Sequence, residues 1–194
     1  MPSNTDMLSA TPLDSLNNAV TALRHSGVIA YPTEAVWGLG CDPDNTAALT
    51  RLLALKQRDP AKGMILVAAG LEQLLPWLDG LATDQRQRLE QPCETPTTWL
   101  VPDNGRAHRL VRGDHQQVAL RISRHPLVAQ LCQAFGGPLV STSANRAGEP
   151  AAMSLAQLHA SFGESLDAVL GGALGGYERP STIRDLLSGR VLRA

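Results

Sequence analysis

The chain has 194 residues, of which 43% are hydrophobic and 18% charged, and its formal net charge is -1. The length is sufficient for one domain with a full hydrophobic core, and the composition excludes a disordered or fibrous protein. The small net charge does not indicate a nucleic-acid or membrane partner, and no apolar run approaches the roughly 18 residues that cross a bilayer. Three cysteines without a CxxC pair, and no signal-peptide pattern, predict a cytoplasmic protein without disulfides.

Helices and strands are predicted to alternate along the chain. Residues 1–10 are small and polar and predict a flexible leader, so the domain is expected from residue 11 onward. Thr11-Pro12 opens a helix with apolar positions from Leu13 onward, and Gly27 ends it. Further helices are expected at 45–56, 71–78, 83–89, 126–135 and 154–162, and strands at 28–31, 64–69, 97–101, 118–122 and 139–142, with short strands around Val169, Ile183 and Val191. This alternation predicts one α/β domain with a single sheet at its centre.

Positive charge is concentrated in two blocks of the sequence. Residues 51–62 include both lysines of the chain, and residues 106–124 include five arginines against Asp114. The two blocks would suit a polyanionic ligand if the fold brings them together. By themselves they fit two solvated basic faces equally well.

Residues 31–40, with the sequence YPTEAVWGLG, predict a buried strand that breaks at Pro32 and continues into a loop with two glycines. Such a segment brings backbone close to a neighbour, and Thr33 offers a hydroxyl at the strand end, where α/β sheets bind ligands. An ordinary turn with structural glycines explains the same residues equally well.

Lys56-Gln57-Arg58 ends the second predicted helix. On a regular helix Lys56 and Arg58 would not share a face, but both could turn toward one anion where the helix unwinds. Basic residues also favour helix C-termini because they offset the dipole, and for this motif alone that simpler explanation is favoured.

Two further segments are rich in hydroxyl groups. Residues 138–148 run from a buried strand into Ser-Thr-Ser-Ala-Asn and a glycine-containing loop, which can form a cradle for a polar ligand or simply a capped turn. Residues 180–185 (PSTIRD) follow the glycine pairs of Gly171–Gly176, which we expect to be mobile. They fit either a plain edge strand or a second source of hydroxyls for the same pocket.

Several classes of chemistry are excluded by missing motifs. The chain has no GxxxxGK[ST] phosphate loop and no GxSxG nucleophile elbow, and its five histidines show no metal-ligand spacing. Nucleotide chemistry would therefore depend on positioning and charge stabilisation rather than on a covalent nucleophile.

Taken together and in this order, the segments at 31–40, 56–58, 118–126, 138–148 and 180–185 resemble the YrdC/TsaC family of threonylcarbamoyl-AMP synthases, in its short single-domain bacterial form. The resemblance implies a single α/β domain whose strongly twisted mixed sheet is flanked by helices and has an open, positively charged concave face. It implies that L-threonine, bicarbonate and ATP give threonylcarbamoyl-AMP and pyrophosphate. A downstream transferase complex then uses this product to make threonylcarbamoyladenosine next to the tRNA anticodon, and weak direct binding of tRNA is a further expectation.

The same resemblance implies roles for individual residues. The family pairs KxR with SxN, which implies that Lys56, Arg58, Ser143 and Asn145 are catalytic. Threonine would be bound by Thr33, Arg121 and Thr142. The ATP-binding positions are Arg58, Thr98, Arg121, Ser141, Ser143, Ser181 and Arg184. Mg²⁺ is expected to accompany ATP, with no dedicated protein site visible.

This chain differs from the family pattern at three positions. Thr95 stands where a glycine usually allows backbone to approach the ligand, and Gly63 and Ala68 replace residues of a segment that often carries a threonine-binding histidine. Two other functions remain as alternatives. An RNA-binding module would bind with a steep salt dependence and no catalysis, and a nucleotidase-like enzyme would release ADP and phosphate.

Overall fold

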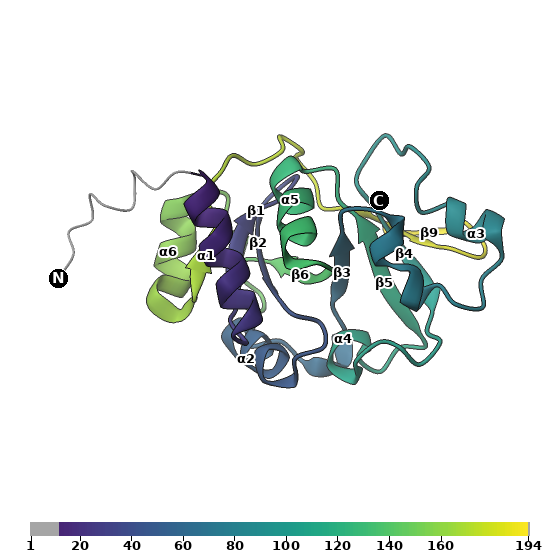
Figure 1. Cartoon of the computed structure of the whole chain (residues 1–194), viewed down its shortest axis with the longest axis horizontal. Helices are drawn as coiled ribbons and strands as arrows, with labels where there is room; N and C mark the ends of the chain where they lie inside the picture. Colours follow the sequence, from purple (N-terminus) through teal and green to yellow (C-terminus); the bar gives the residue numbers. More distant parts are fainter. Residues whose placement is uncertain (1–11, 194) are drawn as a thin grey trace.

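The structure is a computed structural model that describes the backbone of residues 12–193 and the side chains from Leu16 onward. The predicted leader at 1–10, the Thr11 cap and the Leu13 side chain lie outside this part. Figure 1 shows helices arranged around a central sheet. The helices are α1 (Pro12–Arg24), α2 (Thr46–Lys56), α3 (Thr83–Gln87), α4 (Arg109–Arg112), α5 (Pro126–Phe135) and α6 (Leu155–Phe162), with 3-10 turns at Pro60–Lys62, Leu71–Gln73, Leu75–Trp77 and Gly163–Ser165.

The described residues form a nine-stranded sheet with the order β7-β1-β2-β6-β3-β5-β4-β8-β9. Its strands are β1 (Ile29–Pro32), β2 (Trp37–Cys41), β3 (Ile65–Ala68), β4 (Thr97–Pro102), β5 (Gln117–Ile122), β6 (Leu139–Ser143), β7 (Ala168–Val169), β8 (Thr182–Asp185) and β9 (Val191–Arg193). The sheet is mixed, because β1 with β7, β3 with β5, and β4 with β8 pair in parallel while the other neighbours are antiparallel. The predicted α/β class is confirmed.

Three predicted helix ends are confirmed by their caps. The Asn45 side chain accepts a hydrogen bond from the Ala48 amide and starts α2, whose Leu49 and Leu52 are buried. Ser154 caps α6 in the same way, and Gly136 ends α5 with a φ of 95°. The expected helices at 71–78 and 83–89 are shorter in the structure: the first consists of two 3-10 turns, and the second ends at Gln87.

The expected loop after Pro32 is wrong from Trp37 onward, because Trp37–Cys41 is strand β2. Residues 31–40 form a β-hairpin whose turn is closed by the Thr33 amide, which donates to the Val36 carbonyl at 3.1 Å. A Cβ at Gly40 would lie 2.4 Å from the Val140 carbonyl oxygen and 2.8 Å from the Tyr31 hydroxyl. Gly40 therefore permits close approach of neighbouring strands, and the unusual composition of this strand has a packing cause.

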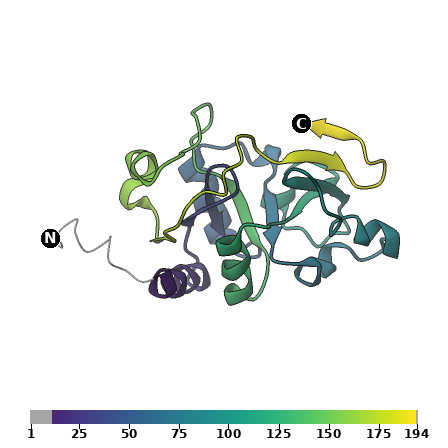
Figure 2. The same ribbon diagram turned by 90° about the horizontal axis from the view of Figure 1, so that it is seen from above.

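Two hydrophobic clusters cover the two faces of the sheet. Leu23 of α1 and Leu131 of α5 share one cluster with Leu139 of β6, while α2 and α6 contribute to a cluster that includes Val140. Figure 2 shows α1 and α5 on one side of the sheet and α6 on the other. Strand β6 continues from Leu139 to Ser141 on the same face, so this face changes from apolar to polar along the strand. No helix in the described part of the chain is long and apolar enough to cross a membrane.

Candidate active site

The polar end of this sheet face lines a cavity with a volume of about 580 Å³. Strands β3, β5 and β6 contribute to its wall, together with the β1–β2 turn, the loop after α2 and the segment before β8. Of the residues predicted from sequence, the cavity is lined by Thr33, Arg58, Arg121, Ser141, Thr142, Ser143, Asn145 and Ser181. The fold thus brings together residues from all five of the motifs.

Lys56 is predicted to share an anion with Arg58, and the structure places the two side chains differently. The Lys56 ammonium is buried and donates to the Ser143 carbonyl, to the Asn145 carbonyl at 2.8 Å and to Asn145 Oδ1 at 3.4 Å. Its three N–H groups therefore have three acceptors, and Lys56 does not line the cavity. Lys56 holds the SxN loop in place, while the expected direct contact between Lys56 and an anion has no support from this geometry.

The SxN loop is also held by its own side chains. Ser143 Oγ donates to Asn145 Oδ1 at 2.5 Å, and Asn145 Nδ2 donates to the Glu149 carbonyl at 2.8 Å. The backbone amide of Ala147 donates to the Lys56 carbonyl at 2.9 Å. The KxR and SxN motifs, which lie far apart in sequence, therefore form one hydrogen-bonded unit at the cavity edge.

Arg58 does reach the cavity, because Gln57 turns the chain. Gln57 has left-handed backbone angles, with a φ of 51° and a ψ of 40°, and ends α2. The Arg58 guanidinium then lies along the cavity wall, where Nη2 donates to the Gly63 carbonyl at 2.9 Å. Burial lowers the pKa of Arg58, but a guanidinium keeps its charge at any physiological pH.

The two basic blocks of the sequence, residues 51–62 and 106–124, meet at the cavity wall near Arg58. The Met64 amide donates to the Val111 carbonyl at 2.7 Å, and the Asp114 amide donates to the Ala61 carbonyl at 3.0 Å. Lys62 and Arg112 line the cavity alongside Arg58, although Arg112 also pairs with Asp103 at 3.3 Å. The fold therefore brings the two basic blocks together, as a site for a polyanionic ligand requires.

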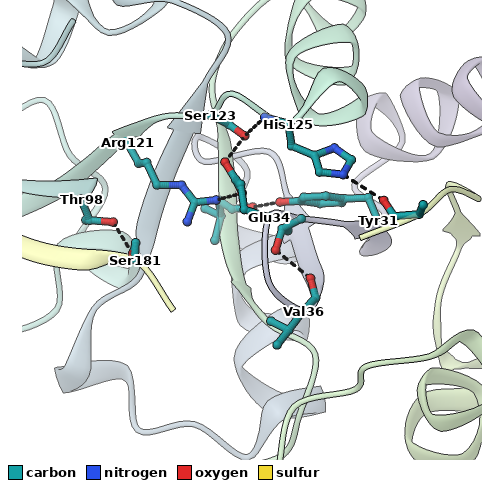
Figure 3. A network of polar contacts seen from close by, with 11 residues as sticks. Tyr31, Glu34, Val36, Thr98, Arg121, Ser123, His125 and Ser181 are labelled. Atoms are coloured by element: carbon teal, nitrogen blue, oxygen red, sulfur yellow. Dashed lines mark hydrogen bonds and ion pairs between the residues drawn. The ribbon is translucent and has the colours of Figure 1, made fainter. Parts of the chain in front are cut away.

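A buried polar network reaches the cavity wall through Glu34 and Arg121 (Figure 3). Arg121 Nη2 donates to Glu34 Oε2 at 2.7 Å, and Ser123 Oγ donates to Glu34 Oε1 at 2.8 Å. Burial opposes ionisation of Glu34, but the charge of Arg121 and the Ser123 hydrogen bond outweigh it and hold the pKa of this carboxyl below its usual value. The Thr33 hydroxyl donates to the Val36 carbonyl at 2.7 Å, so toward a ligand its oxygen can only accept.

Ser181 lines the cavity, and Thr98 supports it. Their hydroxyls are 2.8 Å apart (Figure 3), and Thr98 is completely buried and absent from the cavity wall. The prediction that Thr98 contacts nucleotide therefore has no support from its position. Thr95 lies outside this cavity too, and its hydroxyl pairs with that of Thr182 at 3.1 Å.

Arg184 does not line the cavity, and Arg193 does. Ser181 and Ile183 face the cavity, so the alternation of β8 directs Arg184 to the other face of the sheet, where its Nε is buried without a hydrogen-bond partner in the described structure. Arg193 of β9 donates from Nη2 to the Ser181 carbonyl at 2.7 Å. Sequence reasoning missed Arg193 and Arg179, because the pairing of the last two strands decides which arginines reach the site.

The residues present do not provide a metal site of their own. Within residues 12–193 no group of three or more His, Cys, Asp and Glu side chains is arranged to hold a metal ion. Glu34 is the only acidic residue on the cavity wall among the described residues, and both of its oxygens accept hydrogen bonds from protein groups.

The fold and the cavity define a class of α/β proteins that have a cavity on one face of a mixed sheet. The Sua5/YciO/YrdC family model, which has the description "Telomere recombination", matches residues 21–194, and the chain belongs to this family.

Individual relatives cover nearly the whole chain. The threonylcarbamoyl-AMP synthase of Chromohalobacter salexigens is 66% identical over 180 residues, which cover 93% of this chain and 97% of that one. That of Cellvibrio japonicus is 53% identical over 178 residues, which cover 92% of this chain and 94% of that one. The structure of P. abyssi Sua5 complexed with L-threonine shares the fold, with a TM-score of 0.82 at 23% identity, over 90% of this chain and 51% of that chain.

Proposed function

We propose that this chain is a threonylcarbamoyl-AMP synthase, which forms threonylcarbamoyl-AMP and pyrophosphate from L-threonine, bicarbonate and ATP. The relatives of that name align with more than nine-tenths of the chain. The structural observation that carries the proposal is a single cavity whose wall combines the cations Arg58, Lys62, Arg112 and Arg121 with the hydroxyl groups of Thr33, Ser141 and Ser181. The cations suit a triphosphate, and the hydroxyl groups together with Arg121 suit a small zwitterion that has a hydroxyl group of its own.

The chemistry requires that two bound reactants meet in line. The threonine amine captures carbon dioxide, and an oxygen of the resulting carbamate attacks the α-phosphate as pyrophosphate leaves. Arg58 and Arg121 would stabilise the negative charge on the phosphates and the carboxylate, because both guanidinium groups lie on the cavity wall. Ser143 and Asn145 would orient the nucleotide, with Lys56 fixing their loop. Most of the rate enhancement would come from positioning and from charges already in place.

Hydrogen-bonding capacity supports the position that we propose for each reactant. The Thr33 oxygen can only accept, so it suits the amine or hydroxyl hydrogen of threonine. Arg121 has a buried Nε without a partner among the described residues, which suits an anionic oxygen. Thr142 lies beside Ser141 on the same wall and is proposed to complete the threonine site. Mg²⁺ would be bound by ATP itself.

The assay that tests the function measures pyrophosphate release. Release that requires both threonine and bicarbonate, with a product of the mass of threonylcarbamoyl-AMP, is the expected result. Release without threonine would point to a different adenylating activity. Release of ADP and phosphate would indicate the nucleotidase alternative.

Two partners are proposed for this protein, a downstream transferase complex and tRNA. The product would pass to a threonylcarbamoyl transferase complex in the cytoplasm that modifies tRNA adenosine next to the anticodon. Arg58, Lys62 and Arg112 on the cavity wall could also give weak, salt-dependent contact with tRNA phosphates. Tight RNA binding without any pyrophosphate release would instead favour the RNA-binding module.

A further inference from the structure

The segment between β7 and β8 crosses the molecule beside the β1–β2 turn. We call residues 171–177 the glycine strap, because Gly171, Gly172, Gly175 and Gly176 lie in it. Figures 1 and 2 show the chain after α6 running to the β8–β9 end of the molecule. The strap therefore connects the two ends of the sheet and leads directly to Ser181 in the cavity.

The strap was expected to be mobile, but hydrogen bonds fix it to the turn that carries Thr33 and Glu34. The Gly175 amide donates to the Thr33 carbonyl at 3.0 Å, and the Tyr177 amide donates to the Glu34 carbonyl at 3.0 Å. His125 Nε2 lies 3.0 Å from the Ala173 carbonyl and is its hydrogen-bond donor. These bonds follow one another along the strap, so it lies against the turn as an added extended strand would.

Close packing explains why Gly175 is required. A Cβ at Gly175 would lie 2.9 Å from Glu34 Cα and 3.0 Å from the Glu34 carbonyl oxygen, and backbone atoms cannot move aside as side chains can. A Cβ at Gly172 would meet Leu127 Cδ1 at 2.2 Å, but this atom is the end of a flexible side chain that can move aside. Gly171 differs from both, because a Cβ there has nothing within 4 Å. Gly175 is thus the strap glycine that packs against the backbone of Glu34, the residue whose carboxylate pairs with Arg121.

Glu34 transmits the position of the turn to the cavity wall. Its carboxylate bonds Arg121 and Ser123, and the Glu34 and Arg121 side chains are only 7% and 10% exposed. A buried ion pair depends strongly on geometry, since a displaced carboxylate leaves a desolvated guanidinium without its partner. A shift of Glu34 would therefore change the direction of the Arg121 guanidinium.

We propose that Glu34 is a positioning residue for Arg121, and that the glycine strap, through Gly175, holds Glu34 in the place where Arg121 is directed at the threonine substrate. This inference rests on the proposed function for the identity of the substrate. The experiment tests the roles of the Glu34–Arg121 pair and of the strap contacts separately from the identity of the substrate.

The experiment compares Gly175→Ala with Gly171→Ala, its matched control on the same strap. Steady-state pyrophosphate release is measured as a function of threonine and of ATP concentration, together with thermal unfolding. We expect Gly175→Ala to raise the KM for threonine about tenfold or more, since misplacement of a positioning group by about 1 Å costs this much. The KM for ATP should change much less, and Gly171→Ala should match wild type in every measurement.

A double-variant cycle tests whether the strap acts through Glu34. Glu34→Gln, which keeps the shape but removes the charge, should raise the KM for threonine in the same way. The double variant Glu34→Gln with Gly175→Ala should then be no worse than the more impaired single variant, because both changes disturb one interaction. Fully additive effects would overturn the connection between strap and Glu34, even where each single variant is impaired.

A measurement without catalysis guards against a purely structural explanation. In hydrogen exchange of the wild-type protein, the amides of Gly175 and Tyr177 should be protected, and Gly175→Ala should lose this protection while the sheet keeps its own. Equal kinetics and equal exchange in Gly175→Ala and Gly171→Ala would overturn the proposal. An inactive wild-type protein would reject the proposed function instead, and the exchange result would still decide whether the strap fixes the turn.

Discussion

Lys56 and Asn145 are 89 residues apart in the sequence, and the Lys56 ammonium lies 2.8 Å from the Asn145 carbonyl oxygen. The same ammonium bonds the Ser143 carbonyl and Asn145 Oδ1. A buried cation surrounded by three oxygen acceptors stabilises a loop that would otherwise expose its carbonyl groups to an apolar surrounding. The two motifs of this family site are thus connected by one side chain.

Lys56→Ala should therefore lower both pyrophosphate release and stability. The variant leaves the Ser143 and Asn145 carbonyls without their donor, which costs about 1–3 kcal/mol in the free energy of unfolding. Catalysis should fall further, because Ser143 and Asn145 lose their orientation at the cavity. Urea unfolding and the pyrophosphate assay measure the two effects, and Lys62→Ala is the control for loss of a lysine in the unfolding measurement alone, because Lys62 lines the cavity. Wild-type turnover by Lys56→Ala would contradict the role given to this residue.

The titration of Lys56 gives a second prediction. Burial, and to a smaller extent the charge of Arg58, lower the pKa of Lys56 to about 8. Lysine in an unfolded chain titrates near about 10.4, so between these values the unfolded chain binds more protons than the folded one. Stability contributed by this group is then lowest below pH 8 and rises as the pH increases through that window.

Two measurements check this titration. Because the chain has only two lysines, Lys56 and Lys62, ¹³C labelling of lysine Cε gives two resonances that Lys62→Arg assigns. The Lys56 resonance should titrate with a midpoint near the pH of about 8 given above. In parallel, the rise in stability with pH should be smaller in Lys56→Met than in wild type. A Lys56 midpoint above pH 10 would show that its three acceptors outweigh burial.

The Thr98–Ser181 hydroxyl pair should show strong energetic coupling. Ser181→Ala leaves the fully buried Thr98 hydroxyl, 2.8 Å away in wild type, without a partner. We expect a loss of about 1–3 kcal/mol in unfolding free energy, and Thr98→Val together with Ser181→Ala should cost less than the two single changes added together. Chemical denaturation of the four proteins completes the cycle. Additive losses would mean that the hydroxyls act independently.

Arg193 and Arg184 should differ in their effect on nucleotide binding. Arg193 lines the cavity and Arg184 does not, so Arg193→Gln should raise the KM for ATP about tenfold, the value of one charged hydrogen bond. Arg184→Gln is expected to leave this KM unchanged. Nucleotide binding followed by calorimetry gives the same comparison without turnover. A larger effect of Arg184→Gln would show that β8 faces the ligand in a different register.

The three cysteines should react unequally. Burial raises the pKa of both Cys41 and Cys132 to about 12, whereas Cys93 is partly exposed. Since the thiolate is the reactive form, a disulfide reagent should modify only Cys93 in the folded protein. The count of reactive thiols should rise to three on denaturation. A Cys93→Ser variant that still reacts in the folded state would contradict the burial of the other two.

Periodicity and local capping determined the elements of this chain. Asn45, Ser154 and Gly136 mark helix ends because their interactions involve residues only a few positions away. The hydroxyl-rich strand ends and the two basic blocks were also visible in the sequence. Their order along the chain was sufficient to predict the family, and the family model that matches residues 21–194 confirms this prediction.

Tertiary structure alone decided which of these residues face the ligand. Lys56 lies under the SxN loop, Arg193 replaces Arg184 at the cavity, and Glu34 acquires its role from Arg121 and the glycine strap. Each assignment depends on strand pairing or on contacts between residues that are far apart in sequence, and no local pattern encodes these distances. The glycines of the strap show the same limit: their composition predicts mobility, but packing against Glu34 makes Gly175 a required contact.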